Sequence, residues 1–310
     1  MHRSQTTSRV LMIRPAAFGA NPETVATNAF QGVPLGTPAE THARARAEFD
    51  GFVSRLRVVG VEVYLFEDTV DPRTPDAIFP NNWFSTHSDG TVVLYPMQPV
   101  SRRSERRPDL FDSLAEDHGF QISRYVDFTD AEEEGLFLEG TGSLVLDHLG
   151  QVAYAALSAR TRAPLLERFG GALGYQVQPF RASDRGLPVY HTNVVLSIGR
   201  SFAVLAEETI DDDAERALVR RRLEDGGREV MTISRDQCRA FAGNLLELKS
   251  TGGDPVIAVS TTAWASLGRD LRARLEQHGA MLVCDVPTIE QAGGGSVRCM
   301  IAELFLPRMS

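Results

Sequence analysis

Short apolar runs and one long amphipathic segment make up the first part of the chain. Residues 10–13 are apolar and predict a strand. Residues 18–38 are rich in Asn, Pro, Gly and Thr and show no period, which predicts a loop of the length typical of lids and binding segments. Apolar residues then recur at helical spacing over residues 41–58, and residues 61–66 predict a second strand.

A single order of elements repeats through the rest of the chain: two short strands joined by a polar turn, an amphipathic helix, and a third strand. The pattern predicts these four elements at residues 82–85, 91–95, 104–118 and 121–126, at 143–146, 152–157, 160–169 and 175–179, at 194–198, 202–206, 213–223 and 229–233, and at 245–248, 256–260, 262–278 and 281–284. Three glycines at 293–295 precede a last alternating run at 297–306, which predicts one more first strand. The N-terminal strand, helix and strand would complete this fifth unit.

A polar residue stands at the start of each unit, and these residues recur at intervals of 57, 52, 53 and 55 along the chain: Asn82, Glu139, His191, Asn244 and Cys299. A period near fifty residues indicates an array built from one supersecondary unit. We therefore expect an α/β fold in which five units close into a ring, which ties the terminal strands together and removes sheet edges. Equivalent positions in such a ring converge on its axis. An ordinary α/β sheet without symmetry is the alternative, because the units share almost no sequence identity.

Composition narrows the classes of partner. The 310 residues carry a net charge of −9, which leaves no basic footprint for nucleic acid. No apolar run approaches the ~18 residues of a membrane span, and the polar start of the chain lacks a signal-peptide core. Three cysteines do not make a disulfide framework, so a reducing cytoplasm is the simplest location. We expect one catalytic domain over residues 1–310, with a homodimer among the assemblies that the sequence allows.

Cys299, His191 and Glu139 have the residue types of a nucleophile, an acid–base group and an orienting carboxylate. A thiolate next to an imidazolium has a lowered pKa and attacks well at neutral pH. Each residue alone has a simpler explanation, because a single Cys or His is more often a packed structural residue and Glu139 lies in a glycine-rich loop. A zinc site of these three residues is disfavoured, because no two of them have the short spacing of zinc motifs.

Four strings of sequence resemble the guanidino-group-modifying enzymes, the pentein superfamily of arginine deiminases, dimethylarginine hydrolases, amidinotransferases and succinylarginine dihydrolase. The strings are FPNNWF at residues 79–84, LEGTGS at 138–143, YHTN at 190–193 and GGGSVRCM at 293–300. The likeness covers nearly the whole chain and is greatest to the bacterial citrulline-utilisation hydrolases. It implies a pentein fold, a five-bladed α/β-propeller of ββαβ units with pseudo-fivefold symmetry. It also implies that Cys299, His191 and Glu139 are catalytic and that no metal or organic cofactor is needed.

Two positions differ from the deiminases of this superfamily, which carry an Asp where this chain has Asn82 and Asn193. An amide suits a neutral ureido group, whereas a buried guanidinium would lose its counter-charge. The sequence therefore favours citrulline, cleaved through a covalent thiocarbamoyl group on Cys299 to ornithine, carbon dioxide and ammonia. A deiminase or dihydrolase of arginine or a modified arginine, and an amidinotransferase, are the alternatives. A non-catalytic binding protein on the same fold is a further one.

An amino-acid substrate also has a carboxylate that needs a cation. By analogy with the superfamily we expect Arg103 to bind it, with Arg102 as the alternative. The amides Asn82, Asn193 and Asn244 complete the expected set of substrate-binding residues.

The long first loop offers weaker candidates. Asn21, Asn28 and Gln31 are polar residues that could contact the α-amino end of the substrate. Cys238 and Cys284 fall on a predicted helix and a predicted strand, where packing is enough to explain them.

Overall fold

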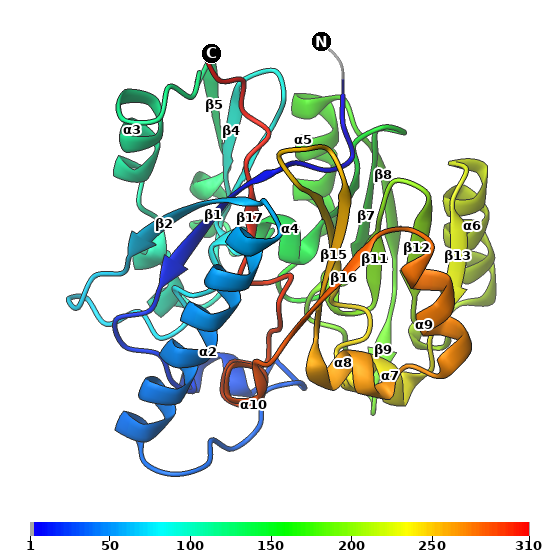
Figure 1. The fold of residues 1–310 in the computed structure, drawn as a ribbon. Helices are drawn as coiled ribbons and strands as arrows, with labels where there is room; N and C mark the ends of the chain where they lie inside the picture. Colours follow the sequence, from blue (N-terminus) through cyan, green and yellow to red (C-terminus); the bar gives the residue numbers. More distant parts are fainter. Residues whose placement is uncertain (1–2, 310) are drawn as a thin grey trace.

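The computed structural model describes residues 3–309, and five three-stranded sheets make up most of its strands (Figure 1). In each sheet the middle strand pairs antiparallel with one neighbour and parallel with the other. The predicted repeat is therefore confirmed. In order of pairing the sheets are β17 (Ala302–Glu303), β1 (Arg9–Arg14) and β2 (Glu62–Glu67); β3 (Phe84–Thr86), β4 (Thr91–Leu94) and β5 (Arg124–Asp127); β6 (Val145–Asp147), β7 (Val152–Ala156) and β8 (Gln176–Phe180); β11 (Leu196–Ile198), β12 (Phe202–Leu205) and β13 (Glu229–Thr232); β14 (Leu246–Lys249), β15 (Pro255–Ser260) and β16 (Ala280–Cys284).

The two ends of the chain meet in one sheet, as the repeat predicts. Leu11 of β1 pairs with Ala302 of β17, and β1 also pairs in parallel with β2. The expectation that closure removes sheet edges is wrong. Within residues 3–309 the five sheets are hydrogen-bonded separately, so each keeps two outer strands, and side-chain packing rather than a continuous ladder joins the units.

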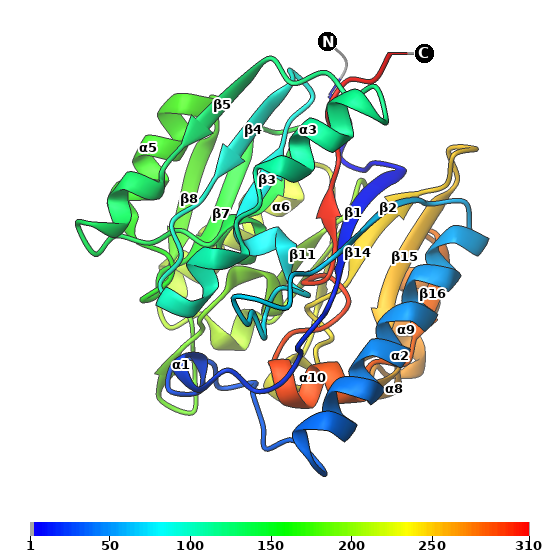
Figure 2. The same cartoon turned by 90° about the vertical axis from the view of Figure 1, so that its left-hand side faces the viewer.

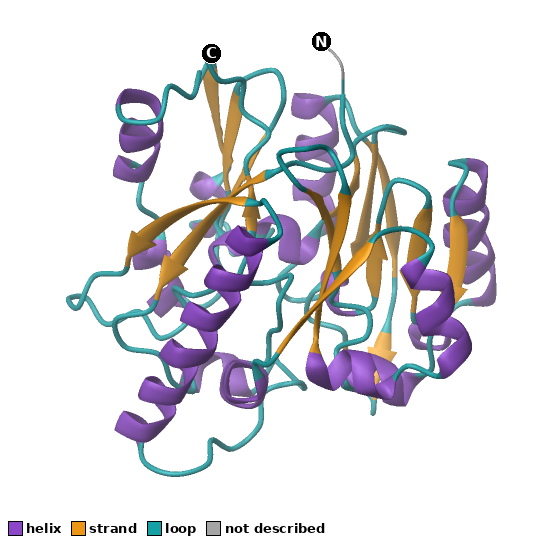
Figure 3. Ribbon diagram, in the orientation of Figure 1, coloured by secondary structure: helices purple, strands orange, loops and turns teal. Residues whose placement is uncertain are grey.

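Helices connect the middle strand of each unit to its third strand, and they lie on the outside of the sheets (Figure 3). α2 begins with a capping box between Thr37 and Glu40 and buries Phe49 and Phe52. The helix lies along strands of two neighbouring sheets (Figure 2). None of the helices in residues 3–309 combines the length and apolar character of a membrane span. The connecting helices are α2 (Pro38–Val58), α3 (Asp109–Glu116), α5 (Ala163–Leu173), α6 (Asp213–Asp225), α8 (Thr261–Ser266) and α9 (Arg269–Glu276).

Three predicted elements differ most from the sequence pattern. The helix expected at 104–118 begins only at Asp109, because Pro108 lacks an N–H group and restricts the residue before it. The helix expected at 262–278 divides into α8 and α9 around Gly268. The strand expected at 297–306 is reduced to β17, because Ser296 to Ile301 form turns closed by backbone hydrogen bonds.

Short elements fill the connections that the sequence left as loops. They are α1 (Pro22–Val25), α4 (Gly140–Ser143), α7 (Arg235–Arg239), α10 (Pro287–Gly293), the 3₁₀ turns η1 (Pro80–Asn82), η2 (Val100–Glu105), η3 (Thr129–Glu132), η4 (Thr192–Val194) and η5 (Glu207–Thr209), and the hairpin β9 (Ser183–Asp184) and β10 (Leu187–Pro188).

A turn precedes the first strand of each unit, and the five polar residues of the repeat lie in or beside these turns. Their positions are not equivalent. Asn82, Asn244 and Cys299 stand two or three residues before their strands, whereas His191 and Glu139 stand five and six residues before theirs. The nearly constant interval therefore hides a shift of about one helical turn, which separates the acid–base pair from the other three.

Candidate active site

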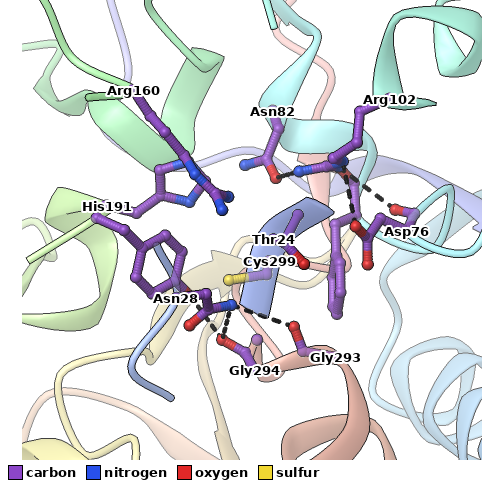
Figure 4. Close-up of a pocket in the computed structure, with 13 residues that line it drawn as sticks. Thr24, Asn28, Asp76, Asn82, Arg102, Arg160, His191, Gly293, Gly294 and Cys299 are labelled. Atoms are coloured by element: carbon purple, nitrogen blue, oxygen red, sulfur yellow. Dashed lines mark hydrogen bonds and ion pairs between the residues drawn. The ribbon is translucent and has the colours of Figure 1, made fainter. Parts of the chain in front are cut away.

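The polar turns of the units, the first loop and the glycine-rich segment after α10 surround one pocket (Figure 4). The side chains that line it carry a thiol, an imidazole, one carboxylate and two guanidinium groups. Its lining residues are Thr24, Asn28, Asp76, Phe79, Asn82, Arg102, Arg160, Tyr190, His191, Gly293, Gly294, Gly295 and Cys299.

Cys299 is 3% exposed, and two side-chain amides donate toward its sulfur. Asn244 Nδ2 lies 3.3 Å and Asn193 Nδ2 3.5 Å from Sγ. Both amides were expected to bind substrate, but the structure places them against the thiol and outside the pocket lining. Burial raises the pKa of the Cys299 thiol, while the Ser296 backbone hydrogen bond and the two amides oppose that rise.

His191 donates a hydrogen bond from Nε2 to the Glu139 carboxylate at 2.8 Å. Burial would raise the pKa of Glu139, but Arg160, the His191 hydrogen bond and Arg102 outweigh it and lower the pKa to about 2. Burial also lowers the pKa of His191 to about 4, so its ring is neutral at pH 7. Because an ionised carboxylate only accepts, Nε2 carries the proton and Nδ1 keeps a lone pair. The lowered pKa of His191 and the raised pKa of Cys299 therefore do not favour the expected thiolate–imidazolium pair.

Glycine is required where α4 passes the acid–base pair. A Cβ at Gly142 would stand 2.4 Å from Asn82 Nδ2 and 2.7 Å from His191 Nδ1. Gly140 has φ +45°, and a Cβ there would lie 2.3 Å from the Asn81 carbonyl oxygen. Gly142 thus lets the backbone approach the Asn82 and His191 side chains closely, and Gly140 lets it approach the backbone of Asn81.

Arg102 is almost fully buried and its donors are held from three sides. Its Nε and Nη2 bind the Glu105 carboxylate at 3.0 and 2.8 Å, and its Nη1 donates to Asn82 Oδ1 at 2.7 Å. Nη2 also points at the backbone oxygens of Asp76 and Phe79. Arg102, which the sequence offered as the alternative to Arg103 for binding the substrate carboxylate, lines the pocket.

Two charged residues of the pocket, Asp76 and Arg160, are not among the site residues expected from the sequence. Arg160 lies with its guanidinium 5.1 Å from the Tyr190 ring centroid, donates to Thr27 Oγ1 at 2.7 Å and leaves its buried Nε without a partner. Asp76 accepts from Asn21 at 2.8 Å, and burial raises its pKa although Arg102 opposes the rise. Asp76 follows a stretch without helical or strand period, and Arg160 is the first residue of a predicted helix, so no pattern placed either near Cys299.

Arg103 lies outside the pocket, contrary to its expected role as the carboxylate ligand. Its Nε donates to the Met97 carbonyl at 3.1 Å, and it pairs with Glu132 at 3.4 Å. Arg102 and Arg103 follow each other on η2, so their side chains point in different directions.

The first loop reaches the pocket through some of its expected polar residues. Asn28 lines the pocket and donates to the carbonyl oxygens of Gly293 and Gly294. Asn21 supports Asp76 from behind, and Gln31 accepts from Thr24 at 2.7 Å. Within residues 3–309 no three His, Cys, Asp or Glu side chains are grouped so as to hold a metal ion.

A sequence model of one protein family, described as N,N dimethylarginine dimethylhydrolase, eukaryotic, matches residues 14–306. The chain belongs to this family. No curated protein sequence matches it. The family acts on a guanidino group by its description, and the expected membership of the guanidino-modifying superfamily is thereby confirmed. The nearer likeness to citrulline-utilisation hydrolases has no such support.

Solved structures show the same fold at low sequence identity. The crystal structure of apo ArgZ, an arginine dihydrolase from the ornithine–ammonia cycle in cyanobacteria, matches with a TM-score of 0.74 and 16% identity over 97% of this chain and 41% of that chain. The N-terminal domain of a substituted ArgZ, covalently bonded to a reaction intermediate, gives a TM-score of 0.73 and 18% identity over 96% of this chain and 99% of that chain. A dimethylarginine dimethylaminohydrolase adduct with S-methyl-L-thiocitrulline gives 0.66 and 16% over 96% and 100%.

These likenesses confirm the pentein fold. The chain spans less than half the length of full-length ArgZ.

Proposed function

We propose that this chain is a cysteine-dependent hydrolase that cleaves a C–N bond at the guanidino carbon of arginine or a modified arginine. The main support is that Cys299 and His191 line the same pocket and that the His191 imidazole is hydrogen-bonded to the Glu139 carboxylate. Asp76 and Arg160 give the same pocket a buried carboxylate and a buried guanidinium for the two charged ends of an amino acid. The family match and the arginine dihydrolase fold support this substrate class.

The geometry supports the following mechanism. A cationic guanidinium beside Sγ favours the thiolate, which offsets the effect of burial on the thiol pKa. His191 Nδ1 takes the thiol proton, and Glu139 stabilises the imidazolium that results. Cys299 Sγ then bonds to the guanidino carbon, and His191 returns the proton to the departing amine. The same imidazole removes a proton from water, the water oxygen bonds to the carbon, and the C–S bond breaks to release a ureido product.

A second reaction, hydrolysis of a ureido group such as that of citrulline, is favoured by Asn82. This amide stands in the pocket wall where the deiminases of the superfamily carry a carboxylate. Attack of Cys299 on the ureido carbon would release ammonia and leave a thiocarbamoyl group. Hydrolysis of that group gives ornithine and carbon dioxide. One pocket that performs both reactions would convert arginine and two waters into ornithine, carbon dioxide and two ammonia molecules.

Product analysis on the purified protein tests the proposal. L-arginine, Nω,Nω-dimethyl-L-arginine and L-citrulline are supplied separately, and citrulline, ornithine and released amine are quantified. We expect turnover of at least one guanidino substrate and none by Cys299→Ser with an unchanged circular dichroism spectrum. Turnover of citrulline alone would replace the guanidino proposal by the ureido one. A Cys299→Ser variant as active as the parent would overturn both.

A further inference from the structure

Three consecutive glycines carry the chain from α10 toward the nucleophile and line the pocket. A Cβ on Gly293 would lie 2.8 Å from Phe79 Cζ, and a Cβ on Gly294 would lie 2.5 Å from Asn28 Nδ2, so this close packing requires glycine. Figure 4 shows Gly293 and Gly294 beside the Asn28 side chain, which donates to their carbonyl oxygens. Glycine also leaves the backbone freer than any other residue does. The position of the nucleophile therefore depends on contacts that restrain the two ends of residues 293–295.

Glu290 and Ser296 provide such a contact across the glycines. Ser296 Oγ donates to Glu290 Oε1 at 2.6 Å. Glu290 lies on α10 three residues before the first glycine, and Ser296 directly follows the last one. The Gly294 N–H also donates to the Glu290 carbonyl oxygen at 2.9 Å. Both side chains are buried, so water does not compete for the hydrogen bond between them.

Ser296 supports the nucleophile through its backbone. Its carbonyl oxygen accepts from the Cys299 N–H at 3.0 Å. Burial raises the pKa of the Cys299 thiol, and a backbone hydrogen bond from Ser296 is the strongest of the effects that oppose this rise. A hydrogen bond lowers the pKa of a thiol when it is donated to the thiolate, so the donor is the Ser296 N–H. The position of Ser296 therefore affects both the place and the ionisation of Cys299 Sγ.

Glu290 is also attached to the neighbouring unit. The Ser260 and Thr262 hydroxyls, at the end of β15 and the start of α8, face its carboxylate and favour the ionised form. Ser260 Oγ accepts from the Ala263 N–H at 3.1 Å, which leaves its own hydrogen for Glu290. Burial raises the pKa of Glu290 and Glu48 raises it further, while the hydroxyls oppose the rise. A buried carboxylate costs free energy unless it is hydrogen-bonded, so these contacts are what makes Glu290 tolerable here.

We propose that Glu290 is a positioning residue of the active site, which holds Ser296 in place and through Ser296 determines the position of the Cys299 thiol. The inference rests on the function proposed above in one respect, the assignment of Cys299 as the nucleophile. Glu290 itself lies outside the pocket lining. When its carboxylate is removed, the glycines allow Ser296 to move, and the hydrogen bond from the Ser296 backbone to Sγ weakens. The thiol should then ionise only at higher pH.

Three variants separate this contact from the rest of the helix. Glu290→Leu keeps the approximate volume but removes the acceptor, and Ser296→Ala removes only the donor. Glu290→Gln keeps an oxygen that can accept from Ser296 Oγ. The control is Glu48→Gln, because Glu48 accepts from the Thr288 and Ile289 N–H groups at 3.0 and 3.1 Å and so caps the opposite end of α10. This control weakens the same helix without changing the contact across the glycines.

The rate of alkylation by iodoacetamide from pH 6 to pH 10, followed on the Cys299 peptide by mass spectrometry, gives the thiol pKa without any substrate. We expect Glu290→Leu and Ser296→Ala each to raise this pKa by about one unit. The double variant should raise it no further, because the two changes remove one contact. The value of kcat/KM at pH 7 should fall on the order of tenfold, since the thiolate fraction below the pKa falls tenfold per unit. Glu290→Gln should keep most of both values, and Glu48→Gln should leave both at the parent values while lowering the midpoint of thermal unfolding.

An unchanged thiol pKa in Ser296→Ala would overturn the inference, and this smallest change decides it if Glu290→Leu does not fold. An equal pKa shift in Glu48→Gln would assign Glu290 to the stability of α10 and would overturn the inference as well. Failure of the parent protein to convert arginine, a modified arginine or citrulline would overturn the proposed function. The alkylation result would still decide whether Glu290 positions the thiol.

Discussion

Asn244 Nδ2 lies 3.3 Å from Cys299 Sγ, and the same nitrogen donates to the Asn193 carbonyl oxygen at 2.8 Å. The oxygen of Asn244 accepts from the Arg298 backbone N–H at 3.2 Å, which fixes the direction of the amide. Asn244 thus offers the sulfur a donor whose hydrogen bond strengthens when the thiol ionises. The turns of two units cooperate here to support the nucleophile of a third.

Replacement of Asn244 by leucine is expected to raise the pKa of the Cys299 thiol by about one to two units, because a hydrogen bond to an ionised group contributes roughly 1.5–3 kcal/mol. The rate of alkylation by iodoacetamide, measured from pH 6 to pH 10, gives this pKa. Cys238 and Cys284 do not interfere near neutral pH, since burial raises the pKa of each to about 12. An unchanged alkylation profile would show that Asn244 only fills space under the thiol.

Glu139→Gln is expected to lower kcat on the order of 10³-fold or more, as loss of the orienting carboxylate does in comparable triads. Glutamine can donate to His191 Nε2 and so move the imidazole proton to Nδ1, where the lone pair is needed. It also removes the charge that holds the imidazolium, so the remaining activity should require higher pH. The pH–rate profile checks this.

Glu247→Gln is the matched control, because Glu247 is equally buried and binds Arg200 away from the pocket. Equal losses in both variants would point to stability instead.

Acid should destabilise the folded protein through its buried histidines. Burial lowers the pKa of His87 to about 4, of His148 to about 3 and of His191 to about 4, from 6.5. The unfolded chain therefore binds more protons below pH 6.5, so this stabilisation is complete above 6.5 and is lost as the pH falls toward these lowered values. Each such group gives a slope of at most about 1.4 kcal/mol per pH unit.

Urea unfolding at pH 7, 6 and 5 measures the slope, and His148→Phe isolates one contribution. We expect the difference in unfolding free energy between parent and variant to shift in favour of the variant as the pH falls. A pH-independent difference would mean that His148 is protonated in the folded state as readily as in the unfolded one.

The fold was predictable because each unit repeats a local signal: a hairpin with a polar turn, then a period of 3.6, then a strand. The polar residue before the first strand of each unit could also be found from the sequence. Two of these residues, Cys299 and His191, line the same pocket. The sequence alone could not show which of these residues occupy the same position in their repeat units. A shift of one helical turn changes a repeat interval of about fifty residues by only a few residues. That shift separates Glu139 and His191 from Asn82, Asn244 and Cys299.

Other site residues depend on contacts that no short pattern encodes. Asp76 comes from a connection without a period, and Arg160 precedes α5, which begins at Ala163 and not at the predicted residue 160. Both line the pocket, and neither local pattern shows this. The choice between Arg102 and Arg103 depended on the direction of side chains along η2. An α-helix and a 3₁₀ turn rotate successive residues by different angles, and Pro108 determines that the α-helix begins later.

Arg160 is the residue that we expect to bind the substrate carboxylate. It lines the pocket, its Nε has no partner among residues 3–309, and its ion pair with Glu139 at 3.6 Å is longer than a hydrogen bond. Arg160→Lys keeps the positive charge and the low pKa of Glu139 but loses the planar fork, so KM should rise about 10- to 100-fold while kcat changes less.

Steady-state kinetics with the preferred substrate and with its decarboxylated amine, agmatine in the case of arginine, provide the check. The variant should bring the two substrates closer in kcat/KM, because the amine has no carboxylate to lose. Arg103→Lys, whose arginine binds Met97 and Glu132 instead, should leave both values unchanged. A rise in KM confined to Arg103→Lys would return the carboxylate site to η2 and show that Arg160 serves only to hold Glu139 ionised.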